Sequence, residues 1–169
     1  MDALWHIGRV RPEQVLAPIY GSAWRYRHRA RLSVREVAKK GTVLVGFHEK
    51  RSSFIADMKS CEILPKRVSD LLVPLRELIN SLSLRKKLPQ IELAVTDEAL
   101  ALVLRVLEKL TADDEAKLRQ FQKDYGVDFW YQPKGPDSIY PMDPENATRL
   151  KLHQRETGVE VVFRPTDFT

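Results

Sequence analysis

The chain has 169 residues, of which 43% are hydrophobic and 30% charged, and its formal net charge at pH 7 is +5. These values are typical of a folded globular protein with one domain, or one domain and an appendage, and they exclude a disordered or fibrous chain. The net positive charge is compatible with a polyanionic partner but does not prove one.

The sequence lacks the motifs that identify several classes of enzyme. The seven glycines form neither a G-x-G-x-x-G pattern nor a phosphate-binding loop, and no serine lies in a nucleophile elbow. The histidines are far apart in sequence, and no two of them form a metal-binding pair on one helical turn. The sequence therefore predicts no self-contained active site.

The cellular location is predicted from two further absences. A single cysteine cannot form an internal disulfide, so a reducing cytoplasm is expected. No apolar run is long enough to span a bilayer, and the N-terminus lacks the apolar centre of a signal peptide. We therefore expect a cytoplasmic chain with no membrane partner.

Residues 1–22 predict the end of a helix and then a linker. The apolar piece at residues 4–7 suits a short helix, and Pro12 and Pro18 interrupt the stretch after it. Proline disfavours helix in the residue before it. The folded domain is therefore expected to begin near residue 23.

Residues 24–35, WRYRHRARLSVR, place five arginines on alternate positions, with Ser33 as the one interruption. A β-strand sends successive side chains to opposite faces, so one face would be mostly apolar and the other would carry the arginines. A helix would scatter the same arginines around its circumference. The spacing therefore predicts a strand. The arginines are Arg25, Arg27, Arg29, Arg31 and Arg35, and the other face holds Trp24, Tyr26, His28, Ala30, Leu32 and Val34.

Arginines about 7 Å apart along one strand face repel one another unless an anion lies across them. One guanidinium group can bind two phosphate oxygens at once and can stack on a base, so the row predicts a binding surface for nucleic acid. Two alternatives stay open. The row could be a solvated edge strand that charge keeps soluble, or the basic face of a scaffold that binds an acidic protein.

The segments after the arginine run alternate between strand and helix patterns. Residues 42–48 are expected to form the returning strand of an antiparallel hairpin, and residues 53–58 a third extended piece. Residues 66–84 have the apolar spacing of a helix, interrupted by Pro74. That helix either kinks at the proline or splits in two, with the proline opening the second piece.

A second hairpin is predicted at residues 91–95 and 100–106, with one face buried. The sequence TADDE at residues 111–115 has the cap and the acidic first turn of a helix that stops at Gly126. This second helix, like the first, carries an apolar side that can cover a sheet.

The C-terminal part is expected to hold a strand at residues 127–131, a long surface loop at residues 132–148, and closing strands at residues 149–154 and 159–163. The order of strands and helices along the chain predicts an α+β fold. Its main element is a mostly antiparallel β-sheet with two covering helices.

The ordered motifs resemble the central domain of the RNA uracil-5-methyltransferases. The similarity spans nearly the whole chain, and the most similar branch methylates a uridine of 23S ribosomal RNA and carries a 4Fe–4S cluster. Each motif alone is weak, but the ordered set is fairly specific. The similar stretches are residues 24–32 (WRYRHRARL), Gly46-Phe47, Ser52-Ser53, residues 59–64 (KSCEIL) and residues 163–168 (FRPTDF).

The resemblance implies an organisation in three parts. Members of that family have an N-terminal β-barrel that binds RNA, a central domain like this chain, and a methyltransferase domain that binds S-adenosylmethionine. The last domain holds the nucleophilic cysteine, which adds to C6 of the uracil, and the general-base glutamate. The chain would then divide into a helix end and linker (1–22), a central RNA-recognition domain (23–165) and the start of a link to the methyltransferase domain (166–169). Alone it is expected to be inactive and to bind no cofactor.

The resemblance also implies roles for single residues, with 23S ribosomal RNA as the partner. Arg31 matches an arginine that faces the RNA and the catalytic cleft, and Phe168 matches an aromatic residue that would stack on the flipped-out uridine. Cys61 matches the last of four cysteine ligands of the iron–sulfur cluster. Without the resemblance, Cys61 would be interpreted as a small buried thiol and Phe168 as a core side chain. The expected RNA-binding residues are Arg25, Arg27, Arg29, Arg31 and Phe168.

Overall fold

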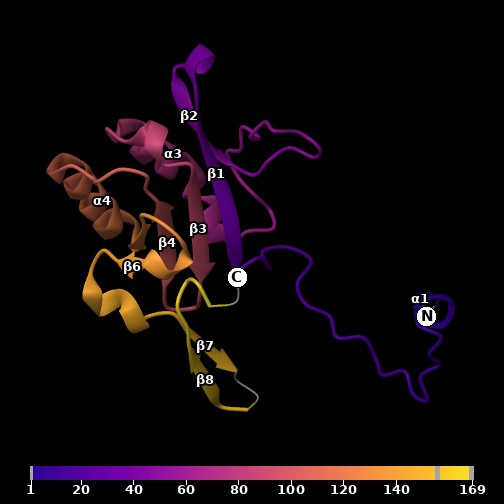
Figure 1. Cartoon of the computed structure of the whole chain (residues 1–169). Coiled ribbons are helices and arrows are strands. Elements are labelled where there is room, and N and C mark those ends of the chain that lie inside the picture. The colour runs from indigo at the N-terminus through magenta and orange to yellow at the C-terminus, as the bar shows by residue number, and fades with distance from the viewer. Residues whose placement is uncertain (1, 155–156, 168–169) are drawn as a thin grey trace.

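The chain folds around one large β-sheet in a computed structural model that describes residues 2–154 and 157–167 (Figure 1). The sheet has the strand order β2-β1-β3-β4-β5-β6, and β7 and β8 form a separate two-stranded sheet. The strands are β1 (Arg29–Val37), β2 (Thr42–Gly46), β3 (Gln90–Val95), β4 (Leu100–Arg105), β5 (Asp128–Gln132), β6 (Tyr140–Pro141), β7 (Lys151–Gln154) and β8 (Val159–Val162). The helices are α1 (Asp2–His6), α2 (Lys66–Ser69), α3 (Leu72–Ser81) and α4 (Ala112–Tyr125), with 3₁₀ turns η1 (Ala38–Lys40), η2 (Arg85–Lys87), η3 (Pro136–Ser138) and η4 (Pro144–Thr148).

Both predicted hairpins are present in the sheet. Strands β1 and β2 pair antiparallel, as do β3 and β4, and β1 also pairs antiparallel with β3. Strand β5 instead lies parallel to β4, because α4 carries the chain back along the sheet before β5 begins. The sheet is therefore mostly antiparallel, and the predicted α+β fold is confirmed.

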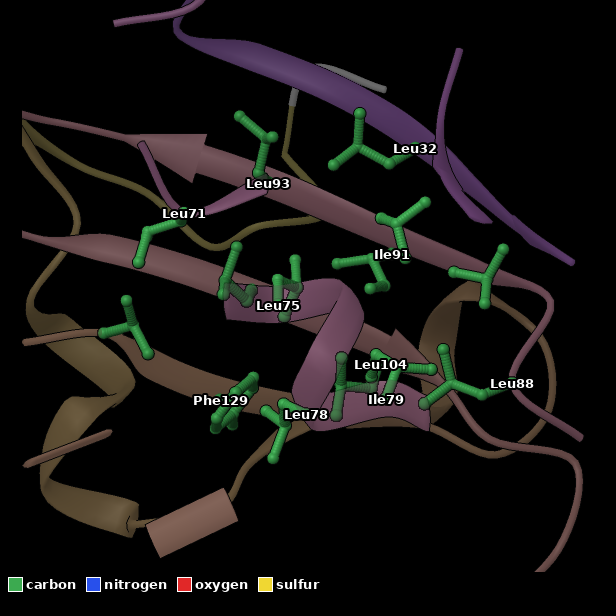
Figure 2. Packing of buried hydrophobic residues seen from close by; sticks show 14 of the residues in the cluster. Leu32, Leu71, Leu75, Leu78, Ile79, Leu88, Ile91, Leu93, Leu104 and Phe129 are labelled. Atoms are coloured by element: carbon green, nitrogen blue, oxygen red, sulfur yellow. The ribbon is translucent and has the colours of Figure 1, made fainter. Parts of the chain in front are cut away.

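One face of the sheet packs against α3 and α4. Leu32, Ile91 and Leu104 point from the strands toward Leu75 and Ile79 of α3, as Figure 2 shows, and all five are buried. Full burial of such a side chain contributes about 1.5–3 kcal/mol, so this core is the main source of stability. The functional residues are expected on the other face, which carries the polar residues of the strands.

Helix α4 begins and ends where the sequence predicted. The Thr111 hydroxyl accepts a hydrogen bond from the backbone N–H of Asp114, and the Asp114 carboxylate accepts one from the backbone N–H of Thr111. This reciprocal pair satisfies two N–H groups that a helix start leaves open. Gly126 ends the helix with a φ of 61°, a left-handed conformation that glycine adopts without strain.

The opposite face is covered over only part of its area. Ala94, Ala101 and Trp130 form a small apolar cluster there, against which Leu150 and the half-buried Phe163 pack. Residues 100–104 of β4 are consequently buried on both faces, so the prediction of a single buried face is wrong for this strand. The C-terminal segment supplies much of the cover, which sequence periodicity does not reveal.

Several other segments differ in detail from their predictions. The helical region 66–84 is split into α2 and α3, and Pro74 lies in the first turn of α3, where a missing N–H costs little. Residues 53–58 form a single bridge between Ile55 and His48 instead of a strand. The two closing strands are confirmed as β7 and β8, which pair with each other.

The N-terminal residues lie outside the packed body. Helix α1 has five residues, and residues 7–28 contain no further helix or strand. Figure 1 shows the first part of this segment running away from the sheet as an extended arm, while Arg25 and Arg27 near its end are hydrogen-bonded to the loop at residues 62–63. None of the helices in the described part of the chain has the length and apolar character needed to cross a membrane.

Candidate nucleic-acid interface

The sheet face opposite α3 and α4, which we call the open face, carries an ordered set of polar side chains. Strand pairing aligns Ser33 with Gln90, Gln90 with Arg105, and Arg105 with Gln132. These four residues, the polar row, run across β1, β3, β4 and β5. The polar row lies beside the small apolar cluster, on the same face of the sheet.

Arg31 stands beside the polar row and is well placed to meet a ligand. It lies two residues from Ser33 on β1, and side chains two apart in a strand share a face. Its guanidinium binds Glu92 of β3 at 2.9 Å, and Glu92 also accepts a hydrogen bond from Gln90 at 2.8 Å. The Arg31 side chain is still 62% exposed. The ion pair therefore orients the guanidinium without removing it from solvent.

The prediction that the strand begins at residue 24 is wrong. Strand β1 begins at Arg29, and Arg25 has a φ of 61°, a left-handed conformation that breaks an extended run. Trp24 and Tyr26, assigned to the apolar face, are 60% and 56% exposed. The alternation of buried and exposed side chains holds only from Arg29 onward, where Ala30 begins the buried positions.

Arg25 is held by the segment around Cys61. Its guanidinium donates to the carbonyl oxygens of Cys61 at 2.7 Å and Leu64 at 3.2 Å, and it pairs with the Glu62 carboxylate at 2.7 Å. Its backbone N–H also donates to the Glu62 carbonyl. All of these acceptors belong to one short loop. Arg25 thus ties residues 61–64 to the start of the folded body.

Replacing Arg25 by alanine should loosen this loop. Loss of the side-chain hydrogen bonds should raise the population of open loop states about tenfold, because each such bond contributes about 0.5–1.5 kcal/mol. The half-buried Cys61 thiol reports the change through its rate of reaction with a disulfide reagent. Arg27→Ala removes the same charge but keeps the bond of Arg27 to the loop, from its backbone N–H to the Ile63 carbonyl, and should leave the rate unchanged. Equal rates in both variants would contradict the anchoring role.

The side chains of Arg27 and Arg35 are both exposed, and each donates a hydrogen bond to a backbone carbonyl. Arg27 Nε donates to the Arg29 carbonyl at 3.2 Å, and its guanidinium lies 5.4 Å from the ring centre of Phe47. Arg35 donates to the Ser53 carbonyl at 2.9 Å. Bonds to carbonyl oxygens do not neutralise a guanidinium, so both groups add to the basic potential near β1.

Arg29 links β1 to the C-terminal segment. Its guanidinium donates to the carbonyl oxygens of Pro165, at 2.7 Å, and of Asp167. The backbone N–H of Arg164, together with its guanidinium, bonds to the Asp167 carboxylate and lowers the pKa of that group. Arg29 is therefore oriented toward the protein backbone and holds residues 165–167 next to Arg31.

Phe168 lies outside the described residues, so its predicted place near the RNA stays a prediction.

A buried acid lies near the covered end of the open face. Burial raises the pKa of Asp128, and the opposing Arg149 guanidinium, 2.8 Å away, acts in the other direction. The pair fastens the C-terminal cover to β5 and leaves the polar row free.

Cys61 is half-buried against the main core. Its backbone N–H donates to Ser69 Oγ at 2.8 Å. A cluster with four cysteine ligands needs four thiolates, and the chain has one cysteine. Within residues 2–154 and 157–167, no three histidine, cysteine or acidic residues come together as metal ligands. The residues present here therefore do not fit an iron–sulfur cluster.

Two residues of the open face, Arg105 and Gln132, were not predicted from the sequence. Each is the last residue of a buried strand, and the register places the two side by side. One signal was available, because Arg105 is the only charged residue in the run LALVLR at residues 100–105. Its neighbours across the sheet depend on the parallel pairing of β4 with β5, which the sequence did not indicate.

Comparison with known proteins finds relatives that match nearly the whole chain. No protein-family model matches it. It is 58% identical over 168 residues to the 23S rRNA (uracil(1939)-C(5))-methyltransferases RlmD of Burkholderia lata and Burkholderia ambifaria, and 56% identical to that of Ralstonia pickettii. The match covers 99% of this chain but only 36–37% of the length of these relatives. The chain is thus homologous to a segment of the 23S rRNA uracil-5-methyltransferases, which confirms the family that its motifs indicated.

Proposed function

We propose that the chain is the RNA-recognition part of a 23S rRNA uracil-5-methyltransferase, and that its open face positions the RNA. The observation that carries the proposal is the exposed guanidinium of Arg31, fixed by Glu92 on the sheet face that α3 and α4 leave uncovered. The net charge of +5 and the names of the relatives support it.

The methyl transfer itself belongs, in this proposal, to parts of the enzyme beyond these residues. The full protein would use S-adenosylmethionine to methylate C5 of one uridine in the cytoplasm. Residues 1–22 would be a helix end and linker, 23–165 the RNA-recognition domain, and 166–169 the start of the link to the domain that binds the cofactor. Cys61 would ligate an iron–sulfur cluster only together with three cysteines from elsewhere in that protein.

Single-stranded or looped RNA is the form that suits an exposed sheet face. Its phosphates would fix the position of the chain on the RNA, and its unstacked bases would meet side chains directly. Arg29 ties residues 165–167 to β1, so a base held near Arg31 would lie close to the path toward residue 168. Phe168 would then stack on the target uridine, as the family resemblance implies.

Binding of the 169-residue chain to a loop of 23S rRNA should depend strongly on salt. Contacts to phosphates release counterions, so a few arginine contacts should weaken binding about tenfold or more between about 50 and 200 mM salt. Fluorescence anisotropy with a labelled RNA measures this. Arg31→Ala should weaken binding and flatten the salt dependence.

A matched control for that experiment lies on the other side of the sheet. Arg119 of α4 is also paired with a carboxylate, Asp143, and its side chain is 50% exposed. Arg119→Ala removes the same charge and should leave RNA affinity unchanged. Affinity that ignores salt, or equal effects of the two variants, would contradict the proposal. A pull-down from lysate that survives ribonuclease would favour the acidic protein partner instead.

A further inference from the structure

A small hollow opens on the open face between the polar row and the C-terminal segment. Its volume is about 140 Å³, roughly the space of one small planar ring. Arg31, Glu92 and three members of the polar row are among the residues that line it. The lining residues are Arg31, Gln90, Glu92, Arg105, Gln132, Pro136, Ile139 and Thr166.

Gln132, which lines this hollow, has a buried acceptor atom without a partner in the described residues. Its side chain is buried, at 6% exposed, and its carboxamide oxygen has no hydrogen-bond partner among the described residues. A buried polar atom without a partner costs about 1–3 kcal/mol, so such an atom inside a functional surface points to a missing ligand group. A carboxamide oxygen can only accept hydrogen bonds. The missing group must therefore be a donor.

Arg105 supplies the opposite chemistry in the same hollow. It is exposed and directly opposite Gln132 in the strand register, and within the described residues no acid pairs with it. The nearby carboxylate of Glu92 is already bonded to Arg31 and Gln90. The Arg105 guanidinium therefore has donors available for an acceptor on a ligand.

A ligand that meets both needs must carry donors and acceptors on one small edge. A phosphate offers only acceptors and would leave the Gln132 oxygen unpaired. A nucleobase carries N–H donors and oxygen or nitrogen acceptors side by side. Arginine and glutamine side chains each recognise such base edges through two hydrogen bonds. The chemistry thus favours a base over the backbone of the same RNA.

We propose that this hollow is a base-binding subsite, in which Arg105 and Gln132 read the edge of one unstacked nucleotide of the RNA. The proposal rests on the RNA-binding function inferred above, and it adds a specificity element next to Arg31. The base bound here is distinct from the phosphates that the exposed arginines attract. Selection of one nucleotide would then fix the register of the RNA on the open face.

Abasic scanning tests the subsite directly. In a series of loop RNAs from 23S rRNA, each nucleotide in turn loses its base and keeps its phosphate. The native chain should lose affinity about tenfold at one position, the value expected for one paired base contact. Arg105→Ala should lose a similar factor on intact RNA and nothing further when that position is abasic. Gln132→Met, which keeps the side-chain volume and removes the acceptor, should behave in the same way.

Arg35→Ala is the matched control, because it removes an arginine from the same face outside the hollow. It should weaken intact and abasic RNAs by the same factor. If Arg105→Ala does likewise, the contact is to phosphate and the subsite is wrong, although the chain still binds RNA. Unchanged affinity in both hollow variants would also overturn the subsite. Absence of any RNA binding by the native chain would instead overturn the proposed function.

Discussion

Replacing Arg31 by alanine in the full-length methyltransferase is expected to abolish methylation of 23S rRNA while the fold stays intact. The guanidinium is exposed on the open face beside the segment that leads toward residue 168, so its loss should displace the target uridine. A misplacement of about 1 Å costs on the order of a hundredfold in rate. Transfer of a labelled methyl group to the RNA measures the effect.

Two comparisons separate this role from a structural one. The Arg31 side chain is 62% exposed but that of Glu92 only 15%, so Arg31→Ala should lower the free energy of unfolding by about 1–3 kcal/mol and still unfold cooperatively on heating. Arg31→Lys keeps the charge but loses the fork that binds two oxygens, and it should recover only part of the turnover. Turnover near the native level in Arg31→Ala would remove this residue from the site.

Replacing Asp114 by alanine is expected to be the most damaging single change to stability among the polar residues of the fold. The buried carboxylate accepts hydrogen bonds from the backbone N–H and hydroxyl of Ser83, at 2.8 and 2.6 Å, and from Thr111. Loss of the helix cap and of the partners of Ser83 should cost about 2–4 kcal/mol. Chemical denaturation of the 169-residue chain measures this. Asp113→Ala, which removes the exposed neighbour that pairs with Lys117, should cost about 0.5 kcal/mol or less.

The same carboxylate gives the fold a defined acid sensitivity. Burial alone would raise the pKa of Asp114, but hydrogen bonds from Ser83 and Thr111 outweigh it and lower the pKa below its usual 3.8. An acid with a lowered pKa stabilises the fold above its ordinary pKa, and that contribution disappears as the pH falls through the lower value. The stability gap between the native chain and Asp114→Asn should therefore narrow below about pH 4. A constant gap down to about pH 2 would contradict the assignment.

Local signals explain which parts of the fold could be predicted. The cap at Thr111 and the stop at Gly126 depend on neighbouring residues, so the bounds of α4 follow from the sequence. The alternation of β1 was also predictable from Arg29 onward. The break before it was not, because it comes from hydrogen bonds between Arg25 and a loop more than thirty residues away.

The candidate site was harder to predict because it depends on contacts between strands. The arginine spacing identified Arg31, but it could not show that Arg29 binds the C-terminal backbone or that Glu92 holds Arg31. Arg105 and Gln132 become neighbours only through the parallel pairing of β4 and β5. Periodicity reports the face of a strand and carries no information on what lies across from it.

Photo-cross-linking tests the central claim, that the open face holds the RNA, most directly. The 169-residue chain would be irradiated with a 23S rRNA loop that contains 4-thiouridine, and the cross-linked peptides identified by mass spectrometry. Cross-links are predicted on peptides from β1, β3 and the ends of β4 and β5, including those that carry Arg31 and Arg105. Cross-links confined to α3, α4 or the β7–β8 hairpin would contradict it.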